Sequence, residues 1–145
     1  MHLHELGRLL YQIKLADQKV ASAFERKTGF SLTRYALLMT LQEKGVCAQR
    51  TIKQELNIDQ AAITRHLKIL ENKGYVIRER NPQNNREVFV ELTEQAVLAL
   101  SQCEQEHAFS EHPIYSALSK QEMNHLAKLL NKLNHFDNEE LTYDR

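Results

Sequence analysis

The order of local structure signals within residues 51–93 constrains the fold more than any other feature of this sequence. Residues 49–56 have the pattern of a short helix, and after a tight two-residue turn Asp59 can cap a second helix that continues to Lys73. Gly74 is a natural stop for this second helix, because glycine adopts a left-handed backbone without strain. The segment therefore predicts two helices that are joined by a tight turn.

Two short runs of β-branched and aromatic residues follow, at residues 75–79 and 87–92. The second run alternates Val88, Val90 and Leu92 with Phe89 and Glu91, which is the periodicity of a half-buried strand. Between the runs, residues 80–86 contain four amide side chains and one proline, all of which favour turns. The sequence thus predicts a β-hairpin with a long polar tip, and the whole order is typical of a winged helix-turn-helix domain.

The second of these helices has one apolar face and one polar face. Ile63, Leu67 and Leu70 recur at steps of four and three, so they point toward a core. The opposite face presents Gln60, Ala61, Thr64, Arg65 and Lys68. Glutamine can read adenine in a DNA major groove, arginine can read guanine, and alanine or the threonine methyl group can contact a thymine methyl group. We predict that this face contacts bases; taken in isolation, its charged residues would equally fit a solvated helix surface.

The tip of the predicted hairpin supplies a second candidate contact with nucleic acid. Arg80 and Arg86 flank the amide-rich tip. An arginine on a thin wing can enter a narrow A·T-rich minor groove, where the negative potential is strongest. Asn84 and Asn85 can donate hydrogen bonds to phosphate or shape the turn. We predict that these four residues contact DNA, against the alternative that Arg86 is an ordinary solvated loop residue.

Four further helices are predicted on either side of this segment, so the fold class is mainly α with a small β-hairpin wing. They cover residues 3–27, 33–44 with Thr33 as the cap, 94–111, and 120–134 after a Ser119–Glu122 capping box. The first and last of them repeat apolar residues at steps of three and four, and Ala96, Val97, Leu100 and Cys103 form the inner face of the third. Such long stripes exceed what one small domain needs for its own core. We therefore predict that both ends of the chain form a helical dimerisation module.

Charge and composition narrow the classes of function. The chain has 145 residues and no net charge, but the charge is unevenly distributed. Residues 50–86 hold eight Lys or Arg and four Asp or Glu (+4), residues 1–49 hold seven and four (+3), and residues 87–145 hold four and eleven (−7). A basic centre can place a positive face on DNA. No apolar run approaches the roughly 20 residues that span a bilayer, and the first residues lack a signal-peptide core. We expect a cytoplasmic protein with no membrane partner.

Catalytic, metal and redox functions have little support in the sequence. It has no glycine-rich phosphate loop, no catalytic carboxylate pair in a recognisable context and no nucleophile elbow, so we predict neither enzyme activity nor a cofactor. Cys103 and His107 lie four residues apart with His112 nearby, which leaves a metal-gated regulator as an alternative, although Cys103 also continues an apolar stripe. Cys47, in the turn between the second and third helices, leaves redox gating as another alternative. Two cysteines form no disulfide framework and fit a reducing compartment.

The chain is similar to the MarR (multiple antibiotic resistance regulator) family of winged helix-turn-helix transcription regulators. The similarity rests on residues 56–65, Leu67, residues 70–76, Asn81-Pro82, Arg86 and residues 88–93. It implies a triangular homodimer in which the first, fifth and sixth helices intertwine, the fourth enters the major groove and the wing reaches the minor groove. It also implies repression that a small aromatic or anionic ligand, or cysteine oxidation, relieves. We therefore predict a DNA-binding domain at residues 31–93, a dimerisation region at residues 1–30 and 112–145, and a connecting helix at residues 94–111.

The wing tip departs from the family pattern. Family wings carry an acidic residue followed by two arginines, where this chain has Asn84, Asn85 and Arg86. The Asp–Arg pair that braces the tip is therefore missing, and only the second arginine is retained. The predicted function is a ligand-responsive repressor that binds pseudo-palindromic duplex DNA as a homodimer. A winged-helix module that binds another protein is the alternative from a different class.

Overall fold

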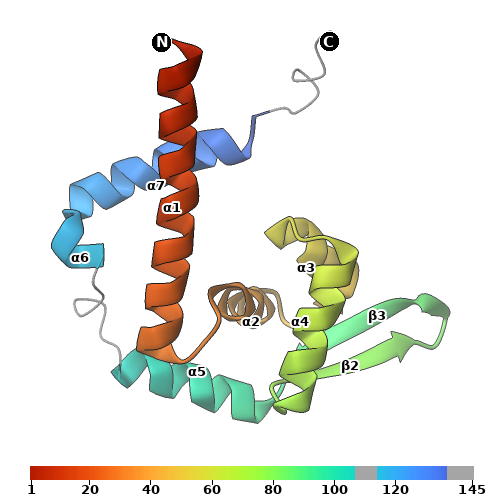
Figure 1. Cartoon of the computed structure of the whole chain (residues 1–145). Coiled ribbons are helices and arrows are strands. Elements are labelled where there is room, and N and C mark those ends of the chain that lie inside the picture. Colours follow the sequence, from red (N-terminus) through yellow and green to blue (C-terminus); the bar gives the residue numbers. More distant parts are fainter. Residues whose placement is uncertain (107–113, 137–145) are drawn as a thin grey trace, which may run out of the picture. The chain divides into compact units, whose positions relative to one another are not determined.

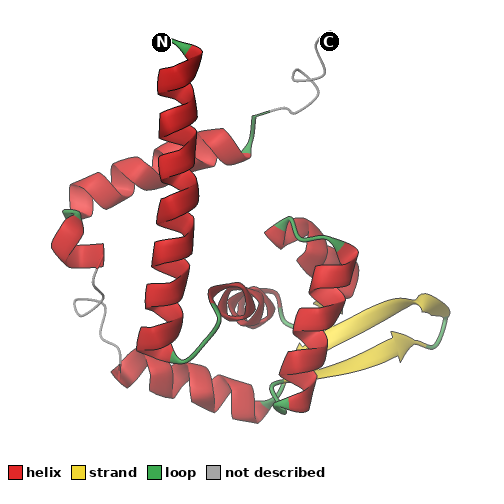
Figure 2. Ribbon diagram, viewed as in Figure 1, coloured by secondary structure: helices red, strands yellow, loops and turns green. Residues whose placement is uncertain are grey.

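The computed structural model describes residues 1–106 and 114–136, apart from the side chains of Asn85 and Tyr115. The chain divides into two compact units, Met1–Phe109 and Ser110–Arg145. The elements of the first unit are α1 (Leu3–Thr28), α2 (Leu32–Lys44), β1 (Cys47–Ala48), α3 (Gln49–Leu56), α4 (Gln60–Asn72), β2 (Val76–Asn81), β3 (Asn84–Leu92) and α5 (Glu94–Glu106). Those of the second unit are α6 (Ile114–Ala117), which was not predicted, and α7 (Lys120–Asn134). The fold is mainly helical with a small β-wing, as predicted (Figures 1 and 2).

Local capping groups set the ends of the first two helices. Gly29 follows α1 with a left-handed backbone (φ 80°), which is the stop that the sequence predicts. Helix α2 begins at Leu32, because the Ser31 hydroxyl accepts a hydrogen bond from Arg34 N at 3.5 Å. The prediction that Thr33 caps this helix is wrong: Ser31 has the non-helical backbone that a cap needs, while Thr33 already lies in the first turn.

Helices α3 and α4 form the predicted helix-turn-helix. Asn57 ends α3 with a left-handed backbone (φ 51°), which asparagine adopts more readily than most residues. Asp59 Oδ1 accepts a hydrogen bond from Ala62 N at 2.7 Å and so caps α4. The three apolar residues of α4 that the spacing selects, Ile63, Leu67 and Leu70, are all buried in the hydrophobic core. The polar face of α4 is therefore left on the surface.

The hairpin belongs to a three-stranded antiparallel sheet with the strand order β1-β3-β2. The additional strand β1 pairs Cys47 with Val90 and Ala48 with Phe89. The interpretation of Cys47 as a turn residue is wrong, because a strand of two residues has no periodicity by which a sequence could reveal it. Its pairing attaches the base of the hairpin directly to the segment between α2 and α3.

Strands β2 and β3 extend further into the wing tip than predicted. β2 ends at Asn81 and β3 begins at Asn84, so only two residues connect the strands. The pairing changes register between Arg80, which lies opposite Val88, and Asn81, which lies opposite Asn84. Residues 85–87 therefore lie in a bulged part of β3. Turn-forming residues remain within a strand here, because a bulge relaxes the regular pairing.

The core of the first unit lies among α2, α3, α4 and the sheet. Its fully buried side chains are Leu37, Leu38, Leu41, Ile52, Ile63, Leu67, Leu70 and Val90. Helix α5 contributes Ala96, Leu100 and Cys103, which are buried as predicted. Val97 was predicted to point inward and is 43% exposed, because it lies just off the stripe that the other three residues form.

Helices α1 and α7 carry apolar stripes that the described residues do not bury. Neither helix contains a buried residue. The exposed apolar residues include Leu6, Leu10 and Ile13 on α1, and Leu126, Leu129, Leu130 and Leu133 on α7. Helix α7 begins at the predicted capping box, in which Ser119 and Glu122 exchange hydrogen bonds of 3.0 and 3.1 Å. Within the described residues, no helix is long and apolar enough to cross a membrane.

Candidate nucleic-acid interface

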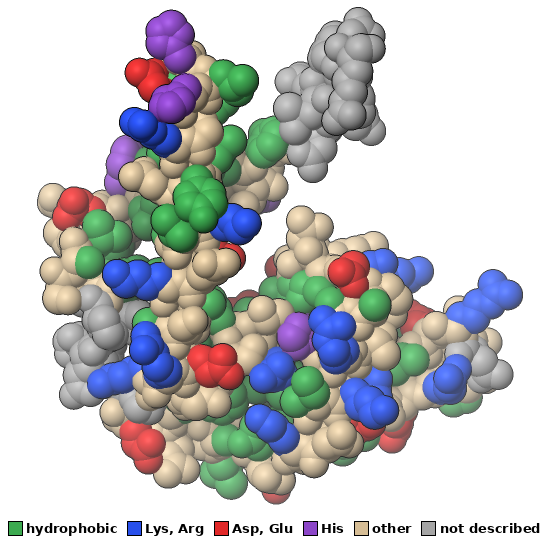
Figure 3. All heavy atoms as spheres, viewed as in Figure 1, with side chains coloured by type: hydrophobic (Ala, Val, Ile, Leu, Met, Phe, Trp, Pro, Cys, Tyr) green, Lys and Arg blue, Asp and Glu red, His purple; other side chains and the backbone are tan. Residues whose placement is uncertain are grey.

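The polar face of α4 is the main candidate surface for contacts with nucleic acid. Its five predicted contact residues, Gln60, Ala61, Thr64, Arg65 and Lys68, are all exposed. The burial of the opposite face fixes the rotation of α4, so this face is held outward by the core rather than by its own polarity. Figure 3 shows Lys and Arg side chains over α4 and toward the end of the wing. The structure thus brings these five residues together on one accessible surface.

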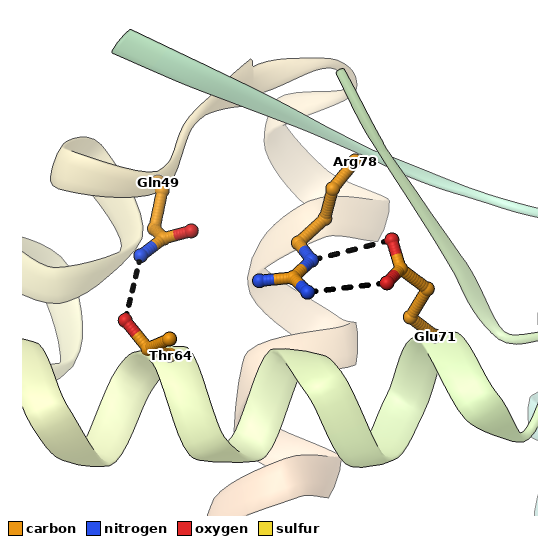
Figure 4. A network of polar contacts seen from close by, with 4 residues as sticks. All are labelled: Gln49, Thr64, Glu71 and Arg78. Carbon is orange, nitrogen blue, oxygen red and sulfur yellow. Dashed lines mark hydrogen bonds and ion pairs between the residues drawn. The ribbon is translucent and has the colours of Figure 1, made fainter. Parts of the chain in front are cut away.

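The Thr64 hydroxyl is already engaged by neighbouring side chains. Thr64 Oγ1 donates to Gln60 O at 2.9 Å and accepts from Gln60 Nε2 at 3.3 Å. It also accepts from Gln49 Nε2 at 3.2 Å (Figure 4). Gln49, at the start of α3, is a buried polar residue that the sequence analysis missed. Because the hydroxyl is occupied, Thr64 has its methyl group left for a base. Gln49 holds the first half of α4 against α3.

His66 lies beside the candidate face and is bonded to Arg34. It is half-buried on α4, and Arg34 Nη1 donates to its Nδ1 at 3.4 Å. Burial, Arg34 and Arg65 together lower the pKa of His66, in that order of importance. A lowered pKa disfavours the charged imidazolium, which is the form of histidine that pairs best with phosphate. Arg34 instead links the start of α2 to the middle of α4.

An ion pair joins the end of α4 to the base of the wing. Arg78 Nε and Nη2, on β2, donate to the two carboxylate oxygens of Glu71 at 3.3 and 3.1 Å (Figure 4). These hydrogen bonds are the main reason that the pKa of Glu71 is lowered. A two-point contact fixes orientation as well as distance. The Glu71–Arg78 pair therefore sets how the wing stands relative to the candidate face.

Replacing Arg78 with glutamine should lower the free energy of unfolding at neutral pH by about 0.5–1 kcal/mol, as expected for a partly exposed, screened ion pair. The pKa of Glu71 is lower in the folded protein than in the unfolded chain. The ion pair therefore makes its full contribution to the free energy of unfolding at pH values above the ordinary glutamate pKa. This contribution disappears as the pH falls through the lowered pKa. Urea unfolding of both proteins from neutral pH to about pH 2 should therefore give converging stabilities. A difference that persists at every pH would contradict the ion-pair explanation, and Arg26→Gln on exposed α1 is the matched control.

The predicted wing residues lie close to the tip of the hairpin. Arg80 lies on β2, and Asn84 and Arg86 lie on β3; all three are exposed. Asn84 Oδ1 accepts a hydrogen bond from Arg86 N at 3.2 Å, so the Asn84 side chain shapes the bulge that carries Arg86. The side chain of Asn85 lies outside the described residues.

A second amide supports the wing tip where the family's Asp–Arg pair is missing. Asn81 Oδ1 accepts from Gln83 N at 3.0 Å, and Asn81 Nδ2 donates to Glu87 Oε2 at 3.2 Å. Glu87 Oε1 also lies 4.0 Å from Arg50 Nη2 of α3. The tip is therefore braced across its two strands and toward α3 through residues that the sequence analysis did not select. A regular continuation of the pairing would place Asn81 opposite Glu87, and their side chains stay hydrogen-bonded although the register shift pairs Asn81 with Asn84 instead.

The alternatives based on metal or redox chemistry gain no support from the described residues. His107 and His112 lie outside them, and within them no group of three or more His, Cys, Asp or Glu residues could hold a metal ion. Burial raises the pKa of both thiols, Cys47 and Cys103, and Glu106 and Glu104 raise that of Cys103 further. A raised pKa keeps a thiol protonated and therefore slow to oxidise.

Known proteins share this arrangement of a helix-turn-helix and a wing. The sequence model of the MarR family matches residues 30–88, which span α2, α3, α4, β2 and the first half of β3. An uncharacterized HTH-type transcriptional regulator of Bacillus subtilis, YdgJ, is 42% identical over 91 residues, which are 63% of this chain and 56% of that protein. Over this segment the chain is similar to the MarR family, and these relatives are described as transcription regulators.

Two further relatives extend the comparison beyond the helix-turn-helix. The multiple antibiotic resistance protein MarR of Salmonella typhimurium is 29% identical over 100 residues, or 69% of each chain. The crystal structure of a Cys-to-Ser mutant of Escherichia coli MarR, complexed with operator DNA, has a TM-score of 0.79 and 25% identity. It covers 92% of this chain and 99% of that one. The fold of this protein is thus shared well beyond the segment that the family model matches, while the alignment with YdgJ spans little more than half of that relative.

Proposed function

We propose that this protein is a MarR-family, sequence-specific regulator that binds duplex DNA. The observation that carries the proposal is the exposed face of α4, with Gln60, Arg65 and Lys68, next to a wing whose tip carries two exposed arginines. Helix α4 inserts into the major groove and presents these residues to base edges. The basic surplus of residues 50–86 supplies attraction to the phosphate backbone.

The wing adds a contact with the neighbouring minor groove. Arg86 lies in a bulge of β3 whose shape Asn84 and Asn81 stabilise. We assign Arg86 to the minor groove, because narrow A·T-rich minor grooves favour arginine. Arg80 and Asn84 lie beside it and contact the phosphate backbone. The Glu71–Arg78 pair keeps the spacing between this contact and that of α4 constant.

The DNA-binding form is a homodimer. Helices α1 and α7 expose rows of leucine and isoleucine side chains that the described residues of the chain leave uncovered. Extended apolar surfaces of this kind are characteristic of subunit interfaces. A two-fold dimer presents two copies of α4 to two half-sites about one helical turn apart, or roughly 10 base pairs.

A small aromatic or anionic effector completes the proposal. A cavity of about 180 Å³ lies between the α1–α2 junction and the end of α4, and Phe30, Tyr75, Arg34 and Lys73 are among its lining residues. Two aromatic rings and two cations match the chemistry of an aromatic acid. Because Arg34 also contacts His66, an occupant of this cavity touches a side chain that holds α4. Release from DNA by such a ligand makes the protein a repressor.

Selection of bound duplexes from a random pool tests this function directly. We expect two inverted half-sites with centres about 10 base pairs apart, and an affinity that falls linearly with the logarithm of the salt concentration. The same selection in the presence of benzoate should recover less DNA. No bound duplex at low salt, or binding without salt dependence, would contradict the proposal and favour a module that binds protein.

A further inference from the structure

A basic groove lies between α3, the start of α4 and the wing, and it adjoins the α4 face described above at Gln60. It has a volume of about 400 Å³, and its lining includes Arg50, Lys53, Gln60, Asn84, Arg86 and Glu87. Arg50 and Lys53 come from α3, and the last three residues come from β3. The groove therefore joins the helix-turn-helix to the wing within one unit.

The charge of this groove is unbalanced. Arg50, Lys53 and Arg86 face one carboxylate, that of Glu87. Among residues 1–106 and 114–136, Lys53 and Arg86 have no ion-pair partner, and the Arg50–Glu87 contact is long, at 4.0 Å. The side chain of Arg50 is 77% exposed and so is free to turn toward a stronger anion. The groove thus holds at least two cations that no carboxylate of the described residues neutralises.

The walls of the groove are held in place by the contacts already described. Gln49 of α3 is tied to Thr64 of α4, and Glu87 of β3 is tied to Asn81 of β2. Gln60 and Asn84 add amide groups that can donate hydrogen bonds. Cations and amide donors on fixed elements are the groups that bind the oxygens of a phosphodiester.

We propose that this groove binds a backbone phosphate of the DNA, at a point between the bases that α4 reads and the minor groove that the wing enters. Lys53 supplies a permanent positive charge to the phosphate. Arg50 turns away from Glu87 and also contacts the phosphate. Glu87 remains beside the phosphate and weakens the contact by repulsion. This inference rests on the proposed DNA-binding function, and it adds α3 to the DNA contact surface.

The salt dependence of DNA binding by the full-length protein separates this contact from base recognition. Lys53→Gln should reduce the slope of log affinity against log salt by about two, one phosphate for each protomer, and weaken binding on the order of tenfold near 0.1 M salt. The preferred sequence should not change. Lys128→Gln on exposed α7 makes the same change in charge and should leave the slope as it is. A wild-type slope for Lys53→Gln overturns the inference, whereas failure of the wild type to bind any duplex overturns the proposed function itself.

Neutralising single phosphates identifies the bound group. We would measure affinity for a set of duplexes that each carry one methylphosphonate. At one position per half-site, the methylphosphonate should weaken DNA binding by the wild type but should not weaken binding by Lys53→Gln any further. Glu87→Gln keeps an oxygen for Asn81 but removes the repulsion, so it should tighten binding about fivefold at low salt. Weaker or unchanged binding by Glu87→Gln overturns the role of Glu87. Loss of inorganic phosphate binding by Lys53→Gln, with an unchanged methylphosphonate profile, would identify a site for free anions and overturn the DNA contact.

Discussion

Replacing Leu10 by glutamate should turn the protein into a monomer and weaken its binding to a duplex with two half-sites by roughly 100-fold or more. Leu10 is 52% exposed and lies in the apolar row of α1 with Leu6 and Ile13. A carboxylate in the centre of such an interface would have to be buried without a partner, which costs several kcal/mol or more. Each monomer would then bind a single half-site, and the gain from linking two contacts would be lost.

The control for this substitution lies two residues further along the same helix. Two residues are separated by about 200° around a helix, so Gln12 projects from the side opposite Leu10. Gln12→Glu introduces the same charge and should leave both the dimer and its affinity intact. Light scattering and a binding titration measure the two effects. A Leu10→Glu protein that remains dimeric with full affinity would contradict the assignment of α1 to the dimer interface.

Replacing Arg65 by alanine should remove the preference for one base in each half-site, at a cost of about 1–3 kcal/mol per half-site. Arg65 is exposed on the face of α4 that the core turns outward. Its neighbour on the helix, His66, is bonded to Arg34 and has a lowered pKa, so we do not expect it to replace the lost guanidinium group. The loss should therefore be confined to sequences that carry the preferred base.

Affinities for a set of duplexes with every base at each position distinguish the roles that Arg65 could have. A base contact predicts a variant that binds the preferred and the altered duplex equally well. A phosphate contact predicts an equal loss for all duplexes and a smaller salt slope, and this outcome would contradict base reading. Arg26→Ala in the last turn of α1 provides a matched change of charge and should change neither quantity.

Helix α4 illustrates what could be predicted from the sequence. The spacing of Ile63, Leu67 and Leu70 determines which face is buried, and Asp59 determines where the helix begins. Both features act within a few residues along the chain, so the outward face with Arg65 follows directly from them. The fold class follows for the same reason, because the order of helices and strands depends on such short-range patterns.

Predictions failed where short-range patterns are weak or compete. Strand β1 is too short to have a periodicity, and Ser31 and Thr33 are both suitable helix caps. The wing strands continue through residues that usually form turns, because pairing with a shifted register outweighs the local preference of Asn81 and Asn84.

By itself, the sequence determined the long helices, the hairpin and the residues of α4 that face outward. Only the tertiary structure decided how these parts are fixed to one another, through Gln49 with Thr64 and Glu71 with Arg78. Each of these contacts joins two different elements, and no repeating pattern along the chain relates their members. The groove beside Lys53 exists for the same reason, since its walls come from α3, α4 and β3, which the packing of the core alone brings together.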